Sequence, residues 1–598
     1  MLHNADAGND RIAYQSSTGT ALADFRISPR VLLLILMGVV TGALGVAAAW
    51  ALIKLIALAT QIAWYGRWSF VSTDIAGTHV GLLGLLIPAF GGLIIGLMAR
   101  YGSEKIRGHG IPEAIEAILM GGSRIQPKVA VLKPLSSAIS IGTGGPFGAE
   151  GPIIMTGGAL GSLFAQCFHL TSVERKTLLV AGAAAGMTGI FGTPVAAILL
   201  AVEMLLFEWR PRSFLPVAMS VVVAAVLRTW VMEAGPLFPF AEQMQVSLQA
   251  LFIWLGIGVI AGGGSAVLTA IVYGTEDLFA KLPLHWMWWP VIGGLVVGVG
   301  GWFQPAALGV GYDLIQAMLD HRLAIGAVAV LMLVKALIWG VALGSGTSGG
   351  VLAPLLIIGC ALGTLAGAVL SPDHIAFCAL LGMAAMMGGT MRSPLTASIF
   401  AMELTGNVGA LLPLMAACSA AHAVTVLLLK RSILTERIAR RGHHISREYG
   451  IDPFETTRVR DVMVTSVDTL PAAMRIREAI AFFSTAVHRH KSYPVLDQHR
   501  CVGMVSRSDV LRWTTDAVED ATLHDALGGG DVICGHPDEL VGELADRMAR
   551  ADVGRVPILG AHGRLVGLIA RKDLLQARAR LLQQEHERAA PLRARAGT

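Results

Sequence analysis

The stretch Gly148-Ala149-Glu150-Gly151-Pro152 places an acidic side chain between glycines, inside a run apolar enough to lie within a bilayer. Glycine lets a backbone approach a ligand closely, and proline favours the first turn of a helix, so Ile153–Phe164 is predicted to be that helix. The N–H groups and positive dipole end of a helix start favour an anion. A carboxylate there can occupy the anion's place until it is protonated or displaced. The stretch therefore predicts an anion pathway gated by Glu150, with a simple acidic helix cap as the alternative.

The composition is that of a membrane protein. Of 598 residues, 54% are hydrophobic and 15% are charged, which is too apolar for a water-soluble chain of this length. The net charge of +5 fits the Lys and Arg bias of cytoplasmic loops, so we expect no nucleic-acid partner. Six single cysteines lack metal-ligand spacing, and residues 1–30 lack a signal-peptide pattern. We therefore expect a polytopic protein of the lipid bilayer without a metal site.

Apolar stretches follow one another from Val31 to Leu429, and several are too short to span a bilayer. Broken helices are tolerated at membrane depth only where they line protein or a watery cavity, so the short stretches indicate an ion site. The predicted fold class is therefore an all-α membrane domain with many broken helices. The long spans are Val31–Ile56, Gly81–Met98, Phe214–Val231, Leu251–Val272 and Ala324–Leu343, and the short stretches are Ile111–Met120, Pro152–Phe164 and Val351–Leu362.

An internal repeat divides the apolar region into two similar halves. Residues 181–194 resemble residues 381–394, and Glu203 matches Glu403, each at an offset of 200. Many transporters consist of two such halves and bind ions where the halves meet. Glu203 and Glu403 lie at matching ends of the repeated helices. We favour a role for both in packing or in fixing a helix end over a role in carrying protons.

The chain changes character after Leu429. Basic residues cluster between 430 and 441, which predicts a cytoplasmic flank. From Arg458 onward short β-type runs alternate with amphipathic stretches, and the pattern repeats after 64 residues. The runs Tyr493–Leu496 and Val556–Leu559 are each followed by a turn and a second apolar run, which predicts two hairpins. We expect two small soluble α+β modules, each with an amphipathic helix after its hairpin.

Three motifs in this order resemble those of the CLC family of chloride channels and chloride/proton antiporters: Gly108–Glu113, Gly148–Pro152 and Gly349–Pro354. The soluble part resembles a tandem pair of CBS domains. The resemblance implies a homodimer in which helix N-termini converge on chloride and Glu150 is the gate. Lys133 matches a family lysine beneath the site, with a snorkelling side chain as the alternative. The anion-binding positions that the resemblance implies are His109, Gly110, Ile111, Gly151, Val351 and Leu352.

Convergence of several helix starts is also a physical requirement. A bare chloride in hydrocarbon costs on the order of tens of kcal/mol. One helix N-terminus contributes about 0.3–1 kcal/mol when it is exposed and about 2 kcal/mol when it is partly buried. Several termini must therefore act on one anion, and water must remain along the route.

Four departures from the CLC pattern bear on the mechanism. His109 stands where the family has a serine donor; it can donate through its imidazole or be a packed polar residue at a helix start. Leu434 stands where a tyrosine completes the central site, and Ala149 replaces a basic residue. Met204 stands where antiporters carry an inner proton-accepting acid, and Glu208 lies one helical turn further on. The possible proton path then comprises Glu203 and Glu208.

The missing acid and the missing tyrosine favour a passive chloride channel gated by voltage or pH, with a proton-coupled chloride antiporter as the alternative. A CBS-bearing divalent-cation transporter is a remote alternative, because the spans contain only isolated acids. Another alternative is a membrane-anchored nucleotide sensor. We expect no enzymatic activity and no required cofactor. Asp509 and Asp573 match the ribose-contacting aspartate of CBS domains, which implies an adenine nucleotide site; the alternative is a dimerisation module without a ligand.

The predicted organisation places the transport domain before the regulatory one. Both termini are expected to be cytoplasmic, with the apolar domain in a cell membrane. The boundaries are a cytoplasmic tail (1–30), a CLC-type transmembrane domain (31–442), a linker (443–457), two CBS domains (458–517 and 518–577) and a charged tail (578–598).

Overall fold

The computed structural model describes residues 29–75, 77, 81–232, 235–442, 454, 457–484, 490–516, 520–527 and 532–579. Its contacts divide the chain into two compact units, one within Phe25–Arg447 and the other within Glu448–Thr598. Each unit is described by itself. Most of the predicted tail 1–30, the linker 443–457 and the tail 578–598 lies outside the described residues.

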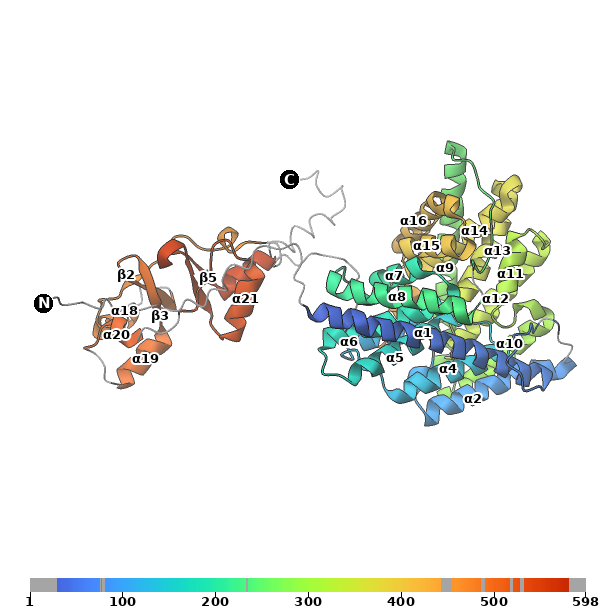
Figure 1. The fold of residues 1–598 in the computed structure, drawn as a ribbon, viewed down its shortest axis with the longest axis horizontal. Helices are drawn as coiled ribbons and strands as arrows, with labels where there is room; N and C mark the ends of the chain where they lie inside the picture. The colour runs from blue at the N-terminus through green and yellow to red at the C-terminus, as the bar shows by residue number, and fades with distance from the viewer. Residues whose placement is uncertain are drawn as a thin grey trace. The chain divides into compact units, whose positions relative to one another are not determined.

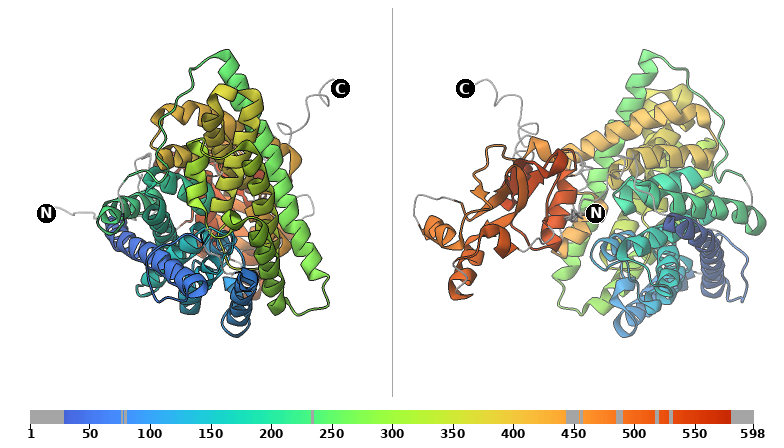
Figure 2. Two further views of the ribbon diagram at one scale, coloured as in Figure 1. Left: turned by 90° about the vertical axis from the view of Figure 1, so that its right-hand side faces the viewer. Right: turned by 60° about the vertical axis from the view of Figure 1, so that its left-hand side comes forward.

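The first unit is built from helices that pack around one another (Figures 1 and 2). Within the described residues, nine helices are long and apolar enough to cross a membrane. The helices are α1 Arg30–Thr60, α2 Ile87–Tyr101, α3 Ile111–Leu119, α4 Pro127–Gly142, α5 Glu150–Gln166, α6 Ser172–Phe191, α7 Pro194–Leu200, α8 Pro211–Val231, α9 Leu248–Ala280, α10 Trp289–Phe303, α11 Tyr312–Leu319, α12 Ile325–Gly344, α13 Leu352–Leu370, α14 Ile375–Met391, α15 Pro394–Thr405, α16 Leu411–Leu428 and α17 Ile433–Arg440.

The predicted spans agree with this architecture. Four of the five long spans fall on single helices, namely α1, α8, α9 and α12, and Gly81–Met98 covers a short 3₁₀ turn followed by α2. The prediction of a short piece at Val351–Leu362 was wrong, because α13 continues to Leu370. The glycines inside that run do not break the helix. They allow α13 to approach α14 closely. A Cβ on Gly363 would overlap the carbonyl oxygen of Cys378 in α14.

The internal repeat appears as two matching helix pairs. Helices α5 and α6 pack side by side, and so do α13 and α14. In the first pair Gly182 approaches the carbonyl oxygen of Gly157 so closely that a Cβ could not fit. The second pair repeats this contact between Gly382 and the carbonyl oxygen of Gly359. Such close approach of small residues is how helices associate where lipid removes the hydrophobic driving force.

The two halves exchange helix caps. The Glu403 carboxylate, on α15, accepts hydrogen bonds from the N–H groups of Val195 (3.0 Å) and Ala196 (2.8 Å) at the start of α7. Glu203, in the π-helical turn Ala201–Leu206 that continues α7, accepts from the N–H (3.0 Å) and hydroxyl (2.5 Å) of Thr396 at the start of α15. Each glutamate thus satisfies N–H groups that the other half's helix leaves without partners. This geometry gives both residues the helix-end role favoured from the sequence.

The second unit contains two small α+β modules (Figure 1). Its strands form two antiparallel hairpins, β2 with β3 and β4 with β5, and β1 adds to β2 in parallel. Each hairpin carries a register shift, between Val495 and Leu496 and between Ile558 and Leu559. Both predicted hairpins are confirmed. The elements are β1 Leu470–Pro471, α18 Ile476–Ser484, β2 Ser492–Asp497, β3 Arg500–Ser506, α19 Arg507–Asp516, α20 Leu523–Leu527, α21 Val541–Arg550, β4 Arg555–Leu559 and β5 Leu565–Ala570.

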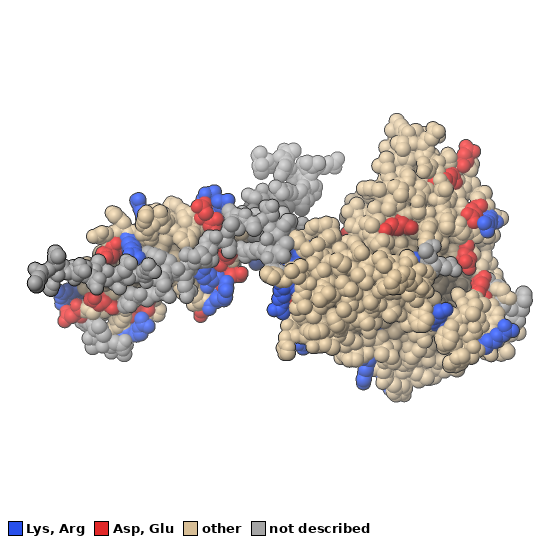
Figure 3. Space-filling view, viewed as in Figure 1, with Lys and Arg blue, Asp and Glu red and all other residues tan. Residues whose placement is uncertain are grey.

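The surfaces of the two units differ in charge. In the face shown in Figure 3, Lys, Arg, Asp and Glu are sparse on the helical unit and frequent on the α+β unit. Large apolar side chains of the helical unit are exposed, for example Leu36, Val222 and Phe252. An apolar exterior of this extent is unfavourable in water but suits a lipid environment. The helical unit therefore has the surface of a membrane domain.

Candidate anion site

Three loops meet at one place in the helical unit, and each leads into a helix start. We call the loops Gly108–Gly110, Gly148–Ala149 and Ser348–Val351 the loop junction; they precede α3, α5 and α13. The Gly350 N–H donates to the Gly148 carbonyl (2.9 Å), and the Gly148 N–H donates back to Gly350 (3.3 Å). The Gly108 N–H donates to the carbonyl of Thr347, which directly precedes the third loop (3.2 Å). The Gly108 carbonyl accepts from the N–H of Gly349 in that loop (3.4 Å). Backbone hydrogen bonds thus hold three helix N-termini together.

Glycine is required at two positions of the loop junction. Gly110 caps α3 with φ +90°, a conformation that residues with a Cβ rarely adopt. Gly151 lies against the carbonyl oxygen of His109, where a Cβ would overlap that oxygen. Close contact between the starts of α3 and α5 therefore depends on Gly151. The other predicted backbone positions lie at the same helix starts and are buried: Ile111 (1% exposed), Val351 (0%) and Leu352 (0%).

The Glu150 side chain is fully buried at the loop junction. Its Oε1 accepts a hydrogen bond from the hydroxyl of Tyr312 (3.0 Å). The backbone N–H of Ala353, in the first turn of α13, lies near the carboxyl group. The Oε2 atom lies close to Gly350. Among the described residues, no donor meets hydrogen-bond geometry at Oε2. The carboxyl group therefore reaches from the start of α5 to the start of α13.

The donor Tyr312 was not predicted from the sequence. It is the first residue of α11, and its ring packs edge-on against Phe191 and Phe238. The only local signal is that it follows a glycine-rich turn, Gly309-Val310-Gly311. Because Tyr312 and Glu150 are 162 positions apart, their contact follows from the fold and not from a local pattern.

His109 lies at the loop junction, as predicted. The side chain is 2% exposed, and among the described residues its Nδ1 has no hydrogen-bond partner. An imidazole nitrogen can act as a donor when it carries its proton. A histidine that served only for packing would have both ring nitrogens in hydrogen bonds. His109 differs from that, because its Nδ1 has no partner in the described structure. The role of His109 as an anion donor stays a prediction.

Lys133 organises the loops of the junction. Its buried ammonium group, on α4, donates to the carbonyl oxygens of Ile106 (2.8 Å) and Gly108 (2.6 Å) and to the hydroxyl of Ser348 (3.1 Å). These contacts use all three donors of the ammonium. Lys133 is thus close to the predicted site and is no snorkelling side chain, since none of its donors turns to the membrane surface.

Leu434 provides no donor in place of the absent tyrosine. It is fully buried at the start of α17, next to Ile433, whose carbonyl accepts a hydrogen bond from Tyr273. Helix α17 is tied to α3 through Glu113, which contacts Arg437 (3.4 Å) and Arg441 (3.3 Å). Two residues of the basic cluster, Arg437 and Arg441, therefore anchor α17 to α3.

The predicted proton path passes through residues with defined contacts. Met204 is fully buried in the π-helical turn after α7. Glu208 accepts a hydrogen bond from the Ser213 hydroxyl (2.7 Å) and lies 3.9 Å from Lys176 and 3.8 Å from Arg210. Neither position provides a buried, unpaired carboxylate. A proton route through Glu203 and Glu208 stays a prediction.

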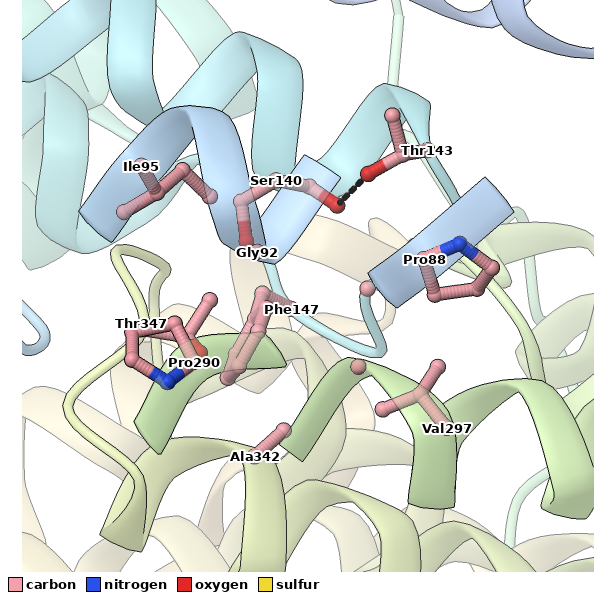
Figure 4. A pocket seen from close by; sticks show the side chains of 12 residues that line it. Pro88, Gly92, Ile95, Ser140, Thr143, Phe147, Pro290, Val297, Ala342 and Thr347 are labelled. Carbon is pink, nitrogen blue, oxygen red and sulfur yellow. Dashed lines mark hydrogen bonds between the residues drawn. The ribbon is translucent and has the colours of Figure 1, made fainter. Parts of the chain in front are cut away.

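A small cavity shares one wall with the loop junction. The Phe147 ring forms this wall, and Pro88, Ile95 and Pro290 contribute apolar surface (Figure 4). The Thr143 hydroxyl donates to the carbonyl of Ser140 (3.2 Å), as the dashed line shows. No charged side chain lines this cavity. We therefore do not assign it to the anion route.

The two aspartates of the soluble unit cap helices of their own modules. Asp509 accepts from the N–H (3.0 Å) and hydroxyl (2.6 Å) of Ser506 and pairs with Arg512 (3.0 Å). Asp573 accepts from the N–H of Ala570 (2.8 Å). Both oxygens of Asp509 are engaged by its own module, so a ligand at this residue has to compete with these bonds.

Comparison with known proteins agrees with the fold and the motifs. A family model described as "Voltage gated chloride channel" matches residues 91–426, and CBS domain models match residues 459–516 and 530–580. The first match covers more than half of the chain. The chain therefore belongs to the voltage-gated chloride channel (CLC) family and carries two CBS domains. It is a multi-pass membrane protein of an anion-transporting family.

Several relatives have names that bear on activity. A putative chloride channel protein, ClcB-like, of Ralstonia nicotianae is 28% identical over 67% of this chain and 96% of its own length. The H⁺/Cl⁻ exchange transporter ClcA of Salmonella paratyphi A is 28% identical over 60% of this chain and 78% of its own length. The crystal structure of a slow cyanobacterial Cl⁻/H⁺ antiporter, 23% identical, matches 70% of this chain and 99% of its own with a TM-score of 0.61, which establishes the fold.

Proposed function

We propose that the protein exchanges chloride for protons across a cell membrane, with Glu150 as the gate of the anion route. The observation that carries the proposal is the fully buried Glu150 carboxylate between the starts of α5 and α13. Partial positive charge at helix N-termini stabilises an anion, and a carboxylate is the protein's own anion in that place. When the carboxylate is protonated it loses its charge, and chloride can take its place. The ionised carboxylate and chloride then compete for one position, and proton binding to Glu150 favours chloride binding.

The anion site in this proposal is formed by the loop junction. Its donors are the backbone N–H groups near Ile111, Gly151, Val351 and Leu352, with the imidazole of His109 as the side-chain donor. Gly110 supplies the turn that aims the start of α3. Lys133 contributes positive charge one layer behind the loops and holds their shape. Burial of these groups strengthens each electrostatic contribution relative to water.

Proton coupling is preferred here to passive conduction because of the relatives. The sequence pattern alone favoured a channel, but relatives that match 60% of this chain are named H⁺/Cl⁻ exchange transporters. Passive chloride conduction remains the second candidate, and one observation favours it: Met204 is a buried apolar residue where antiporters of the family carry an acid. In the coupled case, Glu203 and Glu208 are the acids that would serve the inner half of the proton route.

The proposal is tested by coupled flux in liposomes that contain the purified protein. An imposed chloride gradient should drive protons uphill, against their own gradient, while chloride and pH are recorded together. Chloride flux without sustained proton pumping would replace exchange by passive conduction. Flux that needs a divalent cation and not chloride would favour the cation-transporter alternative, and no ion flux with tight nucleotide binding would favour the sensor.

We further propose a regulatory role for the CBS pair and a homodimeric assembly in a cell membrane, with both termini cytoplasmic. The CBS modules form the water-soluble part of the chain and can bind a water-soluble ligand. The resemblance to CBS domains implies that this ligand is an adenine nucleotide. Asp573, with one described donor, is better placed to accept ribose hydroxyls than Asp509, whose two oxygens are engaged.

A further inference from the structure

The Tyr312 hydroxyl is the side-chain donor that the gate carboxylate uses. It donates to Oε1 of Glu150 at 3.0 Å, while Oε2 has no donor with hydrogen-bond geometry in the described part of the chain. A hydroxyl donor serves any anionic acceptor, because chloride and a carboxylate oxygen both accept a hydrogen bond from O–H. The donor is therefore positioned for whichever anion occupies this place.

The position of Tyr312 is fixed independently of Glu150. Its ring contacts Phe191 (ring centroids 6.3 Å apart) and Phe238 (5.8 Å), both at steep angles. These edge-to-face contacts restrict the ring, so the hydroxyl stays in place when the carboxylate moves. Tyr312 is also partly exposed, whereas Glu150 is fully buried. Tyr312 as a whole residue is thus less enclosed than the glutamate that it contacts.

A buried cation supports the turn that precedes Tyr312. Lys335 of α12 is 0% exposed, and its ammonium donates to the carbonyl oxygens of Gly309 (2.9 Å) and Val310 (3.4 Å). The ammonium lies close to Gly311, the residue before Tyr312. Positive charge behind the turn, together with the positive end of α11, favours negative charge at the hydroxyl. The surroundings of Tyr312 therefore suit an anion.

We propose that the Tyr312 hydroxyl is a shared donor, which holds the Glu150 carboxylate in the anion route and donates to the transported anion once that carboxylate has left. This inference rests on the proposed function. Leu434 has no hydroxyl, and in this proposal Tyr312 of α11 supplies the phenol. The ligand is a small monovalent anion, with chloride as the probe.

The test is chloride binding to the full chain in detergent, measured by titration calorimetry. The Glu150→Ala variant removes the carboxylate, so that chloride alone uses the hydroxyl. Adding Tyr312→Phe should raise the dissociation constant about tenfold or more, because a hydrogen bond to a charged group is worth at least one tenfold step in affinity. The matched control adds Tyr65→Phe, which removes a phenol that donates to the Asp74 carbonyl instead. That control should bind chloride like Glu150→Ala alone.

Equal affinity in Glu150→Ala with and without Tyr312→Phe would overturn the inference and leave the proposed function standing. Absence of chloride binding in Glu150→Ala alone would refute the anion site itself. If Tyr312→Phe does not fold, bromide bound to crystals of Glu150→Ala gives a second reading. An anomalous peak within hydrogen-bond distance of the Tyr312 oxygen supports the shared donor, and a peak out of its reach overturns it.

Discussion

At the scale of single residues, we propose that His109 contributes to anion affinity through its imidazole. Its Nδ1 has no partner in the described structure, and it lies beside the starts of α3 and α5. Replacing it by alanine should raise the dissociation constant for chloride about tenfold or more, since one hydrogen bond to a charged acceptor is lost. Calorimetry on the purified protein measures this change.

Two further variants separate donation from packing at this position. His109→Ser should recover most of the affinity, because a hydroxyl can donate where the imidazole did. His422→Ala removes another imidazole whose Nδ1 lacks a described partner, on α16, which does not start at the loop junction, and should leave chloride binding unchanged. An affinity that falls equally in His109→Ala and His422→Ala would show that His109 acts only through packing.

The sequence located Glu150 and His109 because each stands in a short motif at a helix start. Tyr312 escaped prediction because its partner is 162 positions away and no local pattern marks a phenol that faces a carboxylate. Lys133 was an evident charge in an apolar run, but its acceptors are carbonyls of a loop brought to it by tertiary structure. Contacts between distant segments are therefore what single-sequence reasoning could not supply.

At the scale of helices, the exchanged caps join the two halves of the repeat. Glu403 caps α7, and Glu203 caps α15. Loss of a helix cap costs about 0.5–2 kcal/mol. Glu203→Ala and Glu403→Ala should therefore each lower the unfolding temperature of the solubilised protein by a few degrees. The exposed Asp373, in a short 3₁₀ turn, gives the control Asp373→Ala, which should have no such effect. Unchanged unfolding in both glutamate variants would contradict the caps.

Hydropathy predicted where helices lie better than where they end. The spans at α1, α8, α9 and α12 were evident because their apolar runs are long enough to cross a bilayer. Helix α13 was predicted too short because its glycines resemble breaks. In the structure these glycines face α14 at close range, and a glycine that packs against a neighbouring backbone does not end a helix. Only the packing partner distinguishes the two cases.

At the scale of the whole molecule, the candidate site depends on one unit alone. The described contacts of the loop junction, from Ile106 to Arg441, lie within the helical unit. A chain that ends at Gly442 should therefore transport chloride in liposomes at a rate similar to that of the full chain. Loss of flux in this truncation, with an unchanged unfolding temperature, would show that the CBS pair is required for transport and does not only regulate it.

The central claim is that a protonatable carboxylate at residue 150 closes the anion route. It is tested most directly by chloride efflux from liposomes across a range of pH, with the full chain and with Glu150→Gln, which keeps the shape of the side chain but cannot ionise. We predict that efflux through the unaltered protein rises as the pH falls, and that efflux through Glu150→Gln does not change with pH. A Glu150→Gln protein that keeps the pH dependence of the unaltered chain would contradict the account.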